Sequence, residues 1–230
     1  MSAARGAPAA RPAGWARLFG RALGLLLPCV LLLTNVRLLL TPAFLELEYR
    51  TPGFPADPYG FTREERLAWS RVALDSLLVA DAGGLLESLR FADGSAVFNA
   101  RELRHMDDVR VLTQLALRLW AALLAVIFAL AALLLAGRAG QALRDGLRLG
   151  AWLTLGLMGA LALALGLAFG TVFVGFHELF FEGDTWLFLY SDTLIRLFPE
   201  RFWRDAFLAI TAASLFEAAL VLAVLRPRRP

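Results

Sequence analysis

The chain has 230 residues and is 59% hydrophobic, whereas soluble domains are roughly half apolar. The excess lies in runs of about 20 residues, the length that crosses a hydrocarbon core about 30 Å thick. The formal net charge is +3. All basic residues other than the histidines are arginines, and they lie mainly near the ends of the apolar runs. This placement favours membrane topology over nucleic-acid binding. The composition therefore predicts an integral membrane protein with no nucleic-acid partner.

Four apolar runs predict four transmembrane helices, over about residues 18–40, 111–136, 150–174 and 205–225. The first run is longer than the apolar region of about 7–15 residues in a secretory signal, so it is expected to remain as a helix. Residues 1–17 form a basic tail rich in Ala, Pro and Gly that is expected to be disordered. A second basic tail covers 226–230. Residues 18–225 are expected to form one domain.

Two polar segments, residues 42–110 and 175–204, separate these helices. In the first, Thr62 and Glu65 have capping-box spacing, which predicts a helix over about residues 63–80. Four glycines in the third apolar run are expected to allow close helix packing: Gly156, Gly159, Gly166 and Gly170. Glu217, a carboxylate deep in the fourth run, is expected to pair helices.

The distribution of arginine predicts the orientation. Both tails and the connector at 137–149 are net basic, whereas the two polar segments hold more acids than arginines. By the positive-inside rule, both termini and the connector are cytoplasmic, and both polar segments are outside. The predicted fold is an all-α membrane protein with four transmembrane helices. Its first extracytoplasmic loop is long and helical, and its second is shorter.

The chain has only two histidines, His105 and His177. Each lies beside the predicted outer end of a membrane helix, so both are expected at the outer headgroup level. His105 belongs to the charged stretch RELRHMDDVR, residues 101–110. There Glu102 and Asp108 lie three residues to either side of it, on one face of a helix. A neighbouring carboxylate can fix the tautomer of an imidazole and raise its basicity. We expect acid–base catalysis by these four residues; a solvated helix with ordinary salt bridges is the alternative.

Other side chains near the histidines are candidate substrate contacts. They are Arg101, Arg104, Arg118, Asp184, Trp186 and Asp192. The aromatic residues would also suit an interfacial belt. Glu102 and His105 form one E-x-x-H motif, whereas a di-iron site needs two, and no H-E-x-x-H zinc motif occurs. The single cysteine, Cys29, cannot build a cysteine-based metal site. We expect neither a metal nor another cofactor, and no G-x-S-x-G or phosphate-loop motif occurs.

Three strings carry a resemblance to a known family. They are FNARELRHMxDV at 98–109, FHxxFF at 176–181, and WxF at 186–188 followed by DTLIxLFP at 192–199. With the order of the helices, they make the chain resemble a bacterial family of four-helix membrane proteins that includes the lipoprotein intramolecular transacylase, Lit. The resemblance covers about residues 18–225.

The resemblance implies an acyltransferase of the bacterial cytoplasmic membrane, with its site on the extracytoplasmic side. Its substrate would be the diacylglyceryl-modified N-terminus of a lipoprotein. The protein would be surrounded by membrane lipid. The acyl chain would move from the glyceryl sn-2 position to the α-amino group of the cysteine, giving a lyso-form lipoprotein. The family's histidines would map onto His105 and His177. We expect a monomer.

The residues present fit such a transfer because the substrate would supply its own nucleophile, the α-amine. The protein would then need a base, an acid and an electrostatic clamp. One hypothesis makes His105 the base, whereas His177 would polarise the ester carbonyl or protonate the leaving glyceryl oxygen. The two histidines could also exchange these roles. Arg101 or Arg104 would stabilise the oxyanion. The alternatives are a metal-dependent membrane lipid or peptide hydrolase and a non-enzymatic scaffold or transport subunit.

Overall fold

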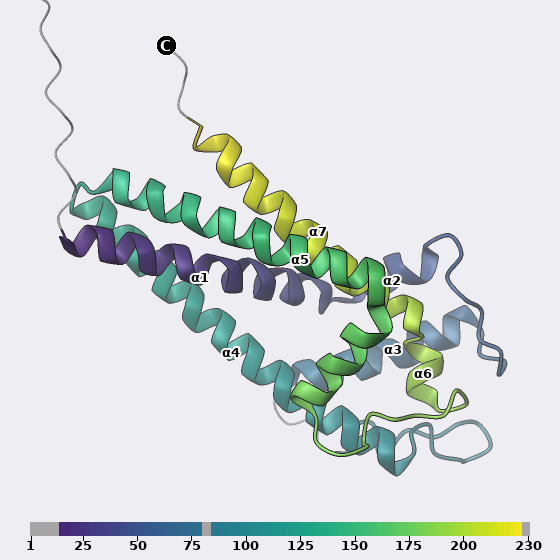
Figure 1. Cartoon of the computed structure of the whole chain (residues 1–230). Helices are drawn as coiled ribbons and strands as arrows, with labels where there is room; N and C mark the ends of the chain where they lie inside the picture. Colours follow the sequence, from purple (N-terminus) through teal and green to yellow (C-terminus); the bar gives the residue numbers. More distant parts are fainter. Residues whose placement is uncertain (1–13, 80–83, 227–230) are drawn as a thin grey trace, which may run out of the picture.

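The structure is a computed structural model that describes residues 14–79 and 84–226. Four of its helices are long and apolar enough to cross a membrane: α1 (Gly14–Leu39), α4 (Ala100–Ala136), α5 (Gly140–Phe180) and α7 (Glu200–Val224). The shorter helices are α2 (Pro42–Arg50), α3 (Arg63–Leu78) and α6 (Thr193–Leu197). Figure 1 shows α1, α5 and α7 side by side, with α4 diverging from them. The predicted all-α class with four membrane helices is confirmed.

The described ends of the chain differ from the predicted tails. α1 begins at Gly14, so residues 14–17 are helical, although they were expected to be disordered. This stretch contains Trp15 and Ala16, and Ala16 packs against Leu134 and Ala142 at the α4–α5 connection. These contacts stabilise the first helical turn. The rest of the N-terminal tail, and residues 227–230 of the second tail, lie outside the described residues.

α4 starts well before its apolar run because of a strong N-terminal cap. The Asn99 side chain accepts hydrogen bonds from the N–H groups of Arg101 and Glu102, and the Glu102 carboxylate accepts one from Asn99 N. With 37 residues, α4 is about 55 Å long at 1.5 Å per residue. It therefore exceeds a hydrocarbon core of about 30 Å. The charged stretch at 101–110 is a continuous extension of the membrane helix.

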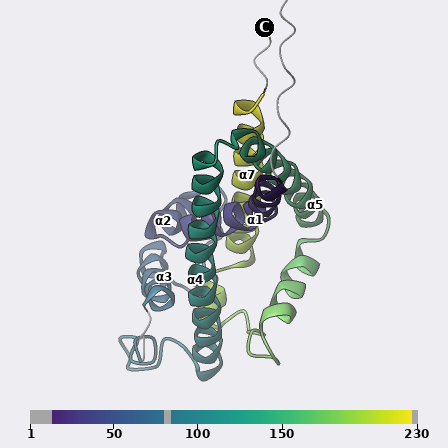
Figure 2. The same ribbon diagram turned by 90° about the vertical axis from the view of Figure 1, so that its left-hand side faces the viewer.

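α5 is also longer than predicted, at both ends. It begins at Gly140, so most of the predicted connector at 137–149 is helical. Residue 168 has non-helical dihedral angles (φ −151°, ψ 52°) and lies between Gly166 and Gly170, residues with weak helix propensity. Beyond this kink the helix turns toward α4, as Figures 1 and 2 show. The kink carries the segment with His177 back toward the start of α4.

The close contact between α1 and α5 uses different glycines from those predicted. A Cβ atom at Gly146 would overlap the Gly20 carbonyl oxygen, and one at Gly150 would lie 2.8 Å from Gly24 O. Apart from the adjacent residues and backbone of the same helix, no atom of the described residues lies within 4 Å of a Cβ built at the four predicted positions, Gly156, Gly159, Gly166 and Gly170. That prediction is wrong because the backbones approach most closely nearer the α4–α5 connection.

A polar contact links α1 to α7 inside the bundle. The buried Asn35 side chain donates hydrogen bonds to Ser214 Oγ (3.0 Å) and Glu217 Oε2 (2.9 Å). These bonds satisfy groups that would be costly to leave unpaired in an apolar bundle. The expectation that Glu217 pairs helices is therefore confirmed.

The short helices form a cap at the end of the bundle opposite the α4–α5 connection, as Figure 1 shows. A core of buried side chains from α3, α4, α6 and the loop before α4 holds this cap together: Ala73, Leu86, Val97, Phe98, Met106, Leu194 and Leu197. Both hydrogen bonds of the Thr62–Glu65 capping box are present, so the predicted start of α3 is confirmed. α3 ends at Leu78, where Val79 takes an extended conformation, close to the predicted end at about residue 80.

Candidate active site

The fold brings the two histidines together at the cap end of the bundle. His105 lies on the second turn of α4, and His177 lies near the end of α5, beyond the kink. Their ring centroids are 6.1 Å apart and the ring planes differ by 19°. The rings are close enough for one bound substrate to reach both of them. The predicted proximity of the two imidazoles is therefore observed.

The surroundings of His105 are apolar. The residue is 8% exposed, and the rings of Phe181 and Phe188 approach it edge-on, at centroid distances of 5.0 and 5.3 Å. Its Nδ1 atom is buried and has no hydrogen-bond partner among the described residues. A buried donor without a partner is costly, so the favoured neutral tautomer leaves Nδ1 unprotonated and places the proton on Nε2.

His177 has a fixed tautomer in its neutral form. Its Nδ1 lies 2.8 Å from the carbonyl oxygen of Phe173, one turn earlier on α5. A carbonyl oxygen only accepts, so Nδ1 must carry the proton, and Nε2 is left with a free lone pair. The rings of Phe173 and Trp186 lie 4.3 and 5.0 Å from the imidazole. This arrangement leaves His177 with one basic nitrogen in an aromatic enclosure.

The carboxylate of Glu102 serves to join two helices. It is 1% exposed; Oε2 accepts a hydrogen bond from Asn99 N (2.7 Å) and Oε1 accepts one from Leu194 N on α6 (2.7 Å). Glu102 therefore fixes the start of α4 against α6. No hydrogen bond joins it to His105 among the described residues, so the expected orienting contact is not observed.

Three other predicted residues hold the second polar segment against α4. Asp192 accepts hydrogen bonds from Leu189 N and from the Asn99 side chain. Asp108 accepts one from the hydroxyl of Thr185 at 3.3 Å, and Arg101 Nη1 donates to Leu187 O at 2.9 Å. These contacts lie around the histidine pair, and none of them involves an imidazole.

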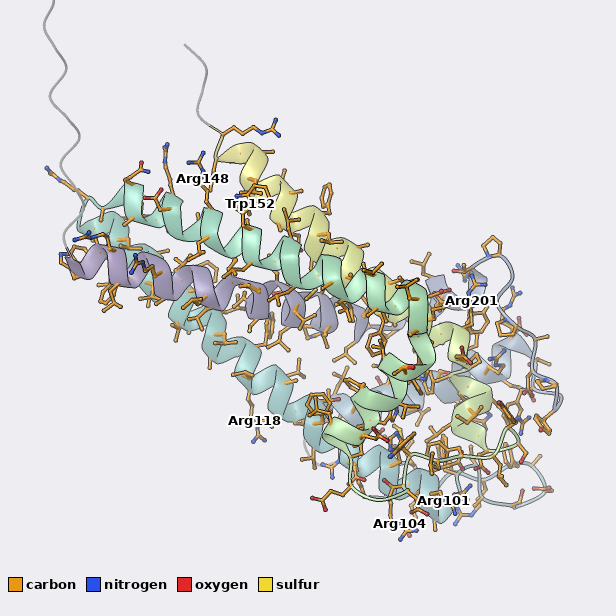
Figure 3. The ribbon with its side chains drawn as sticks, in the orientation of Figure 1. Arg101, Arg104, Arg118, Arg148, Trp152 and Arg201 are labelled. Carbon is orange, nitrogen blue, oxygen red and sulfur yellow. The ribbon has the colours of Figure 1, made fainter. Side chains whose placement is uncertain are left out.

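The remaining predicted residues are spread around the site. Trp186 is the one that contacts a histidine directly. The side chains of Arg104 and Asp184 are exposed, and Figure 3 shows Arg104 beside Arg101 at the outer edge of α4. Arg118 is exposed farther along α4, well separated from both arginines in Figure 3. The structure therefore does not bring Arg118 into the histidine cluster.

Most of the aromatic wall of the site was not predicted. It consists mainly of Phe173, Phe176, Phe181 and Phe188. A signal for part of it exists in the sequence, because Phe173 and His177 are four residues apart and share a helix face. No group of three or more His, Cys, Asp and Glu side chains is placed to hold a metal within residues 14–79 and 84–226. The site is thus a buried and a half-buried imidazole among aromatic rings, a setting that suits proton transfer with limited access of water.

Fold and site together define a multi-pass membrane protein with a paired-histidine centre at one end of its bundle. Residues 22–203 match the model of the family described as "Lipoprotein intramolecular transacylase Lit". The match covers most of the chain, and the protein belongs to this family.

Other proteins share the sequence or the fold. An uncharacterized protein of Aquifex aeolicus (strain VF5) is 29% identical over 211 residues, which cover 90% of this chain and 92% of that protein. The in meso structure of the membrane integral transacylase Lit from Bacillus cereus superposes with a TM-score of 0.78 at 22% identity, covering 93% of this chain and 95% of the other. A structure of that protein with a histidine replaced by arginine gives 0.71 at 21% identity, covering 92% and 91%. These structural matches confirm the fold.

Proposed function

We propose that this protein is a lipoprotein intramolecular transacylase that uses His177 and His105 for acid–base catalysis. Membership of the Lit family supports the reaction class. The observation that carries the assignment to these residues is the approach of the two imidazoles to 6.1 Å within an aromatic enclosure. The substrate is the diacylglyceryl-cysteine at a lipoprotein N-terminus, and its sn-2 acyl chain moves to the α-amino group.

In the proposed reaction His177 Nε2 is the base. It removes a proton from the α-amino group as the nitrogen attacks the sn-2 ester carbonyl. The same proton then passes to the glyceryl oxygen as the carbon–oxygen bond breaks, so the products are an amide and a free hydroxyl. The hydrogen bond from Nδ1 to Phe173 O supports this role, because it leaves Nε2 unprotonated. The hypothesis drawn from the sequence made His105 the base, so this assignment exchanges the roles of the two histidines.

His105 is proposed to act on the carbonyl oxygen. Its Nδ1 has no partner among the described residues, so a proton on Nε2 would be available to the oxyanion. Such a donor is strongest where water is excluded. Arg101 or Arg104 remains a proposed contributor to this charge stabilisation. Glu102 is proposed as a positioning residue that acts through the joint between α4 and α6.

The aromatic enclosure supports acyl transfer over hydrolysis. Water competes with the amine for the ester, and rings packed around both imidazoles limit its access. The amine and the ester belong to one molecule, so proximity supplies much of the rate. We also propose that both polar segments face the extracytoplasmic side, where mature lipoproteins are anchored, and that the protein acts as a monomer.

Replacement of either histidine by alanine tests the proposal. A reporter lipoprotein is produced in bacteria with the wild type, His105→Ala, His177→Ala or the control Asp107→Asn, and its N-terminal peptide is analysed by mass spectrometry. Loss of general acid–base catalysis typically costs about 10²–10⁴-fold, so both histidine variants should lose the N-acyl lyso-form. Asp107 is exposed on the same helix, and its variant should retain the product. Wild-type levels of lyso-form from either histidine variant, at equal membrane abundance, would overturn the assignment.

A further inference from the structure

A cavity on the cap contains a buried cation with an incomplete set of partners. It has a volume of about 390 Å³ including its open mouth, and it lies between the α2–α3 loop, α3 and the segment around α6. Arg66, Asp57 and Arg196 are its ionisable lining residues, and Tyr190 lies at its edge. This site is distinct from the histidine pair, which does not line it.

The charges in this cavity do not balance. Arg196 pairs with Asp57, with Nη2 to Oδ2 at 2.9 Å and Nε to Oδ1 at 3.2 Å. Asp57 also accepts from Phe61 N at 2.7 Å, so its carboxylate is fully engaged. Glu65, near Arg66 on α3, is held by the N–H and hydroxyl of Thr62 in the capping box. One positive charge, that of Arg66, is left in the cavity wall.

Arg66 is buried without a carboxylate. It is 4% exposed, and no Asp or Glu oxygen lies within ion-pair distance of its guanidinium in the described parts of the chain. Nη1 donates to Pro55 O at 2.7 Å, and the rings of Tyr49 and Phe54 lie about 5 Å from the guanidinium carbon. Nε has no partner among the described residues. Cation–π contacts offset only part of the free-energy cost of burying a charge. An anion bound in the adjacent cavity would neutralise the charge of Arg66 and offset the rest of this cost.

The side chains at the rim of the cavity indicate which kind of anion is available there. Tyr190 is 83% exposed and its neighbour Leu189 is 67% exposed, while Pro55, Ala56 and Pro58 form the opposite rim, also exposed. Exposed tyrosine and apolar side chains are typical of protein surface at the headgroup level of a bilayer. Phosphodiesters are the abundant anions at that depth, and each carries the single negative charge that would balance Arg66.

We propose that this cavity binds a phosphate group, that of a phospholipid headgroup, with Arg66 as the principal cation and Tyr190 as a hydroxyl donor at the rim. A guanidinium suits this ligand because its planar N–H groups match phosphate oxygens. The bound lipid would anchor the cap at the membrane surface. Tyr190 belongs to the same segment as Trp186 and Phe188. A lipid bound in the cavity would therefore also restrict the motion of the aromatic wall of the histidine site. The binding itself does not depend on the proposed transacylase reaction.

Thermal unfolding of the full-length protein in a phosphate-free maltoside detergent tests the proposal. The probes are dihexanoyl-phosphatidylglycerol, inorganic phosphate and the phosphate-free dihexanoylglycerol. The short-chain phospholipid should raise Tm in a saturable way, whereas dihexanoylglycerol should not. A response to inorganic phosphate as well would show that the phosphate group alone suffices. A response to the lipid alone would show that the headgroup is recognised as part of a lipid.

Three variants locate the response. Arg66→Gln should raise the apparent Kd for the phospholipid about tenfold or more, the effect of losing a hydrogen bond to a charged group. Ala56→Glu keeps Arg66 and adds a carboxylate at the rim, so it should abolish the response even if Arg66→Gln fails to fold. Arg63→Gln, exposed on the same helix and outside the cavity lining, is the matched control and should respond like the wild type. An unchanged response in Ala56→Glu, no response in the wild type, or an equal response to dihexanoylglycerol would overturn the proposal.

Discussion

At the scale of single residues, the pairing of His105 and His177 could be predicted from their positions beside the ends of two membrane helices. The role of Glu102 could not. Its spacing from His105 was compatible with an orienting carboxylate, but the structure directs both oxygens to backbone N–H groups, one of them on α6. That partner is distant in sequence, so no local pattern marks it. The tautomer of His177 also depends on a contact that only coordinates reveal.

Glu48 gives a residue-scale prediction about pH. This carboxyl on α2 is 5% exposed. Burial, followed by the nearby carboxylate of Asp205, raises its pKa to about 7, and Arg201 offsets part of this rise. Between pH 4.5 and about 7 the folded state retains a proton that the unfolded chain has lost. Stability should therefore fall as pH rises through this window. The cost is on the order of 3 kcal/mol, at about 1.4 kcal/mol per pKa unit.

Glu48→Gln removes this titration. Its Tm should be close to that of the wild type at pH 5 and higher by several degrees at pH 8, measured for purified protein in detergent. Glu64→Gln, an exposed position on α3, serves as the control and should follow the wild-type pH dependence. Parallel Tm curves for the wild type and Glu48→Gln between pH 5 and 8 would show that Glu48 does not control stability in this range.

At the scale of elements, the number and type of the membrane helices could be predicted, but their ends could not. Apolar runs mark the part of a helix that lies in hydrocarbon, whereas α4 and α5 continue into charged sequence. The capping box at Asn99 and Glu102 is the local signal that could have placed the start of α4 correctly. The glycines that mediate helix contact were misassigned because a glycine-rich run does not reveal which stretch faces a neighbouring backbone.

Packing between α1 and α5 gives the prediction at this scale. A methyl group at Gly146 would meet backbone atoms of Gly20, which cannot move aside as a flexible side chain can. Gly146→Ala should therefore destabilise the protein by about 1–3 kcal/mol, the usual cost of overpacking, and lower Tm by several degrees. Gly156→Ala, on the same helix with open space around it, should leave Tm unchanged or slightly higher. Equal Tm values for the two variants would contradict this account of the α1–α5 contact.

At the scale of the whole molecule, the histidines meet because α5 bends. A straight α5 would continue along α7, but the kink at residue 168 turns its last segment toward α4. The sequence contains glycines on either side of this position, but no proline or other clear marker of a bend. The orientation across the membrane remains a prediction from arginine placement. The fold thus places two distant segments, 101–110 and 173–188, around one apolar centre.

Transfer of a labelled acyl chain tests the central claim most directly. The purified protein is reconstituted in lipid vesicles with a diacylglyceryl lipopeptide whose sn-2 acyl chain carries ¹³C, and the products are sequenced by tandem mass spectrometry. The predicted result is that the label moves to the α-amino nitrogen of the cysteine within one molecule and leaves a free sn-2 hydroxyl, and that His177→Ala abolishes this product. Release of the label as free fatty acid would indicate a hydrolase, and an unaltered lipopeptide in the presence of folded wild-type protein would contradict the proposed reaction.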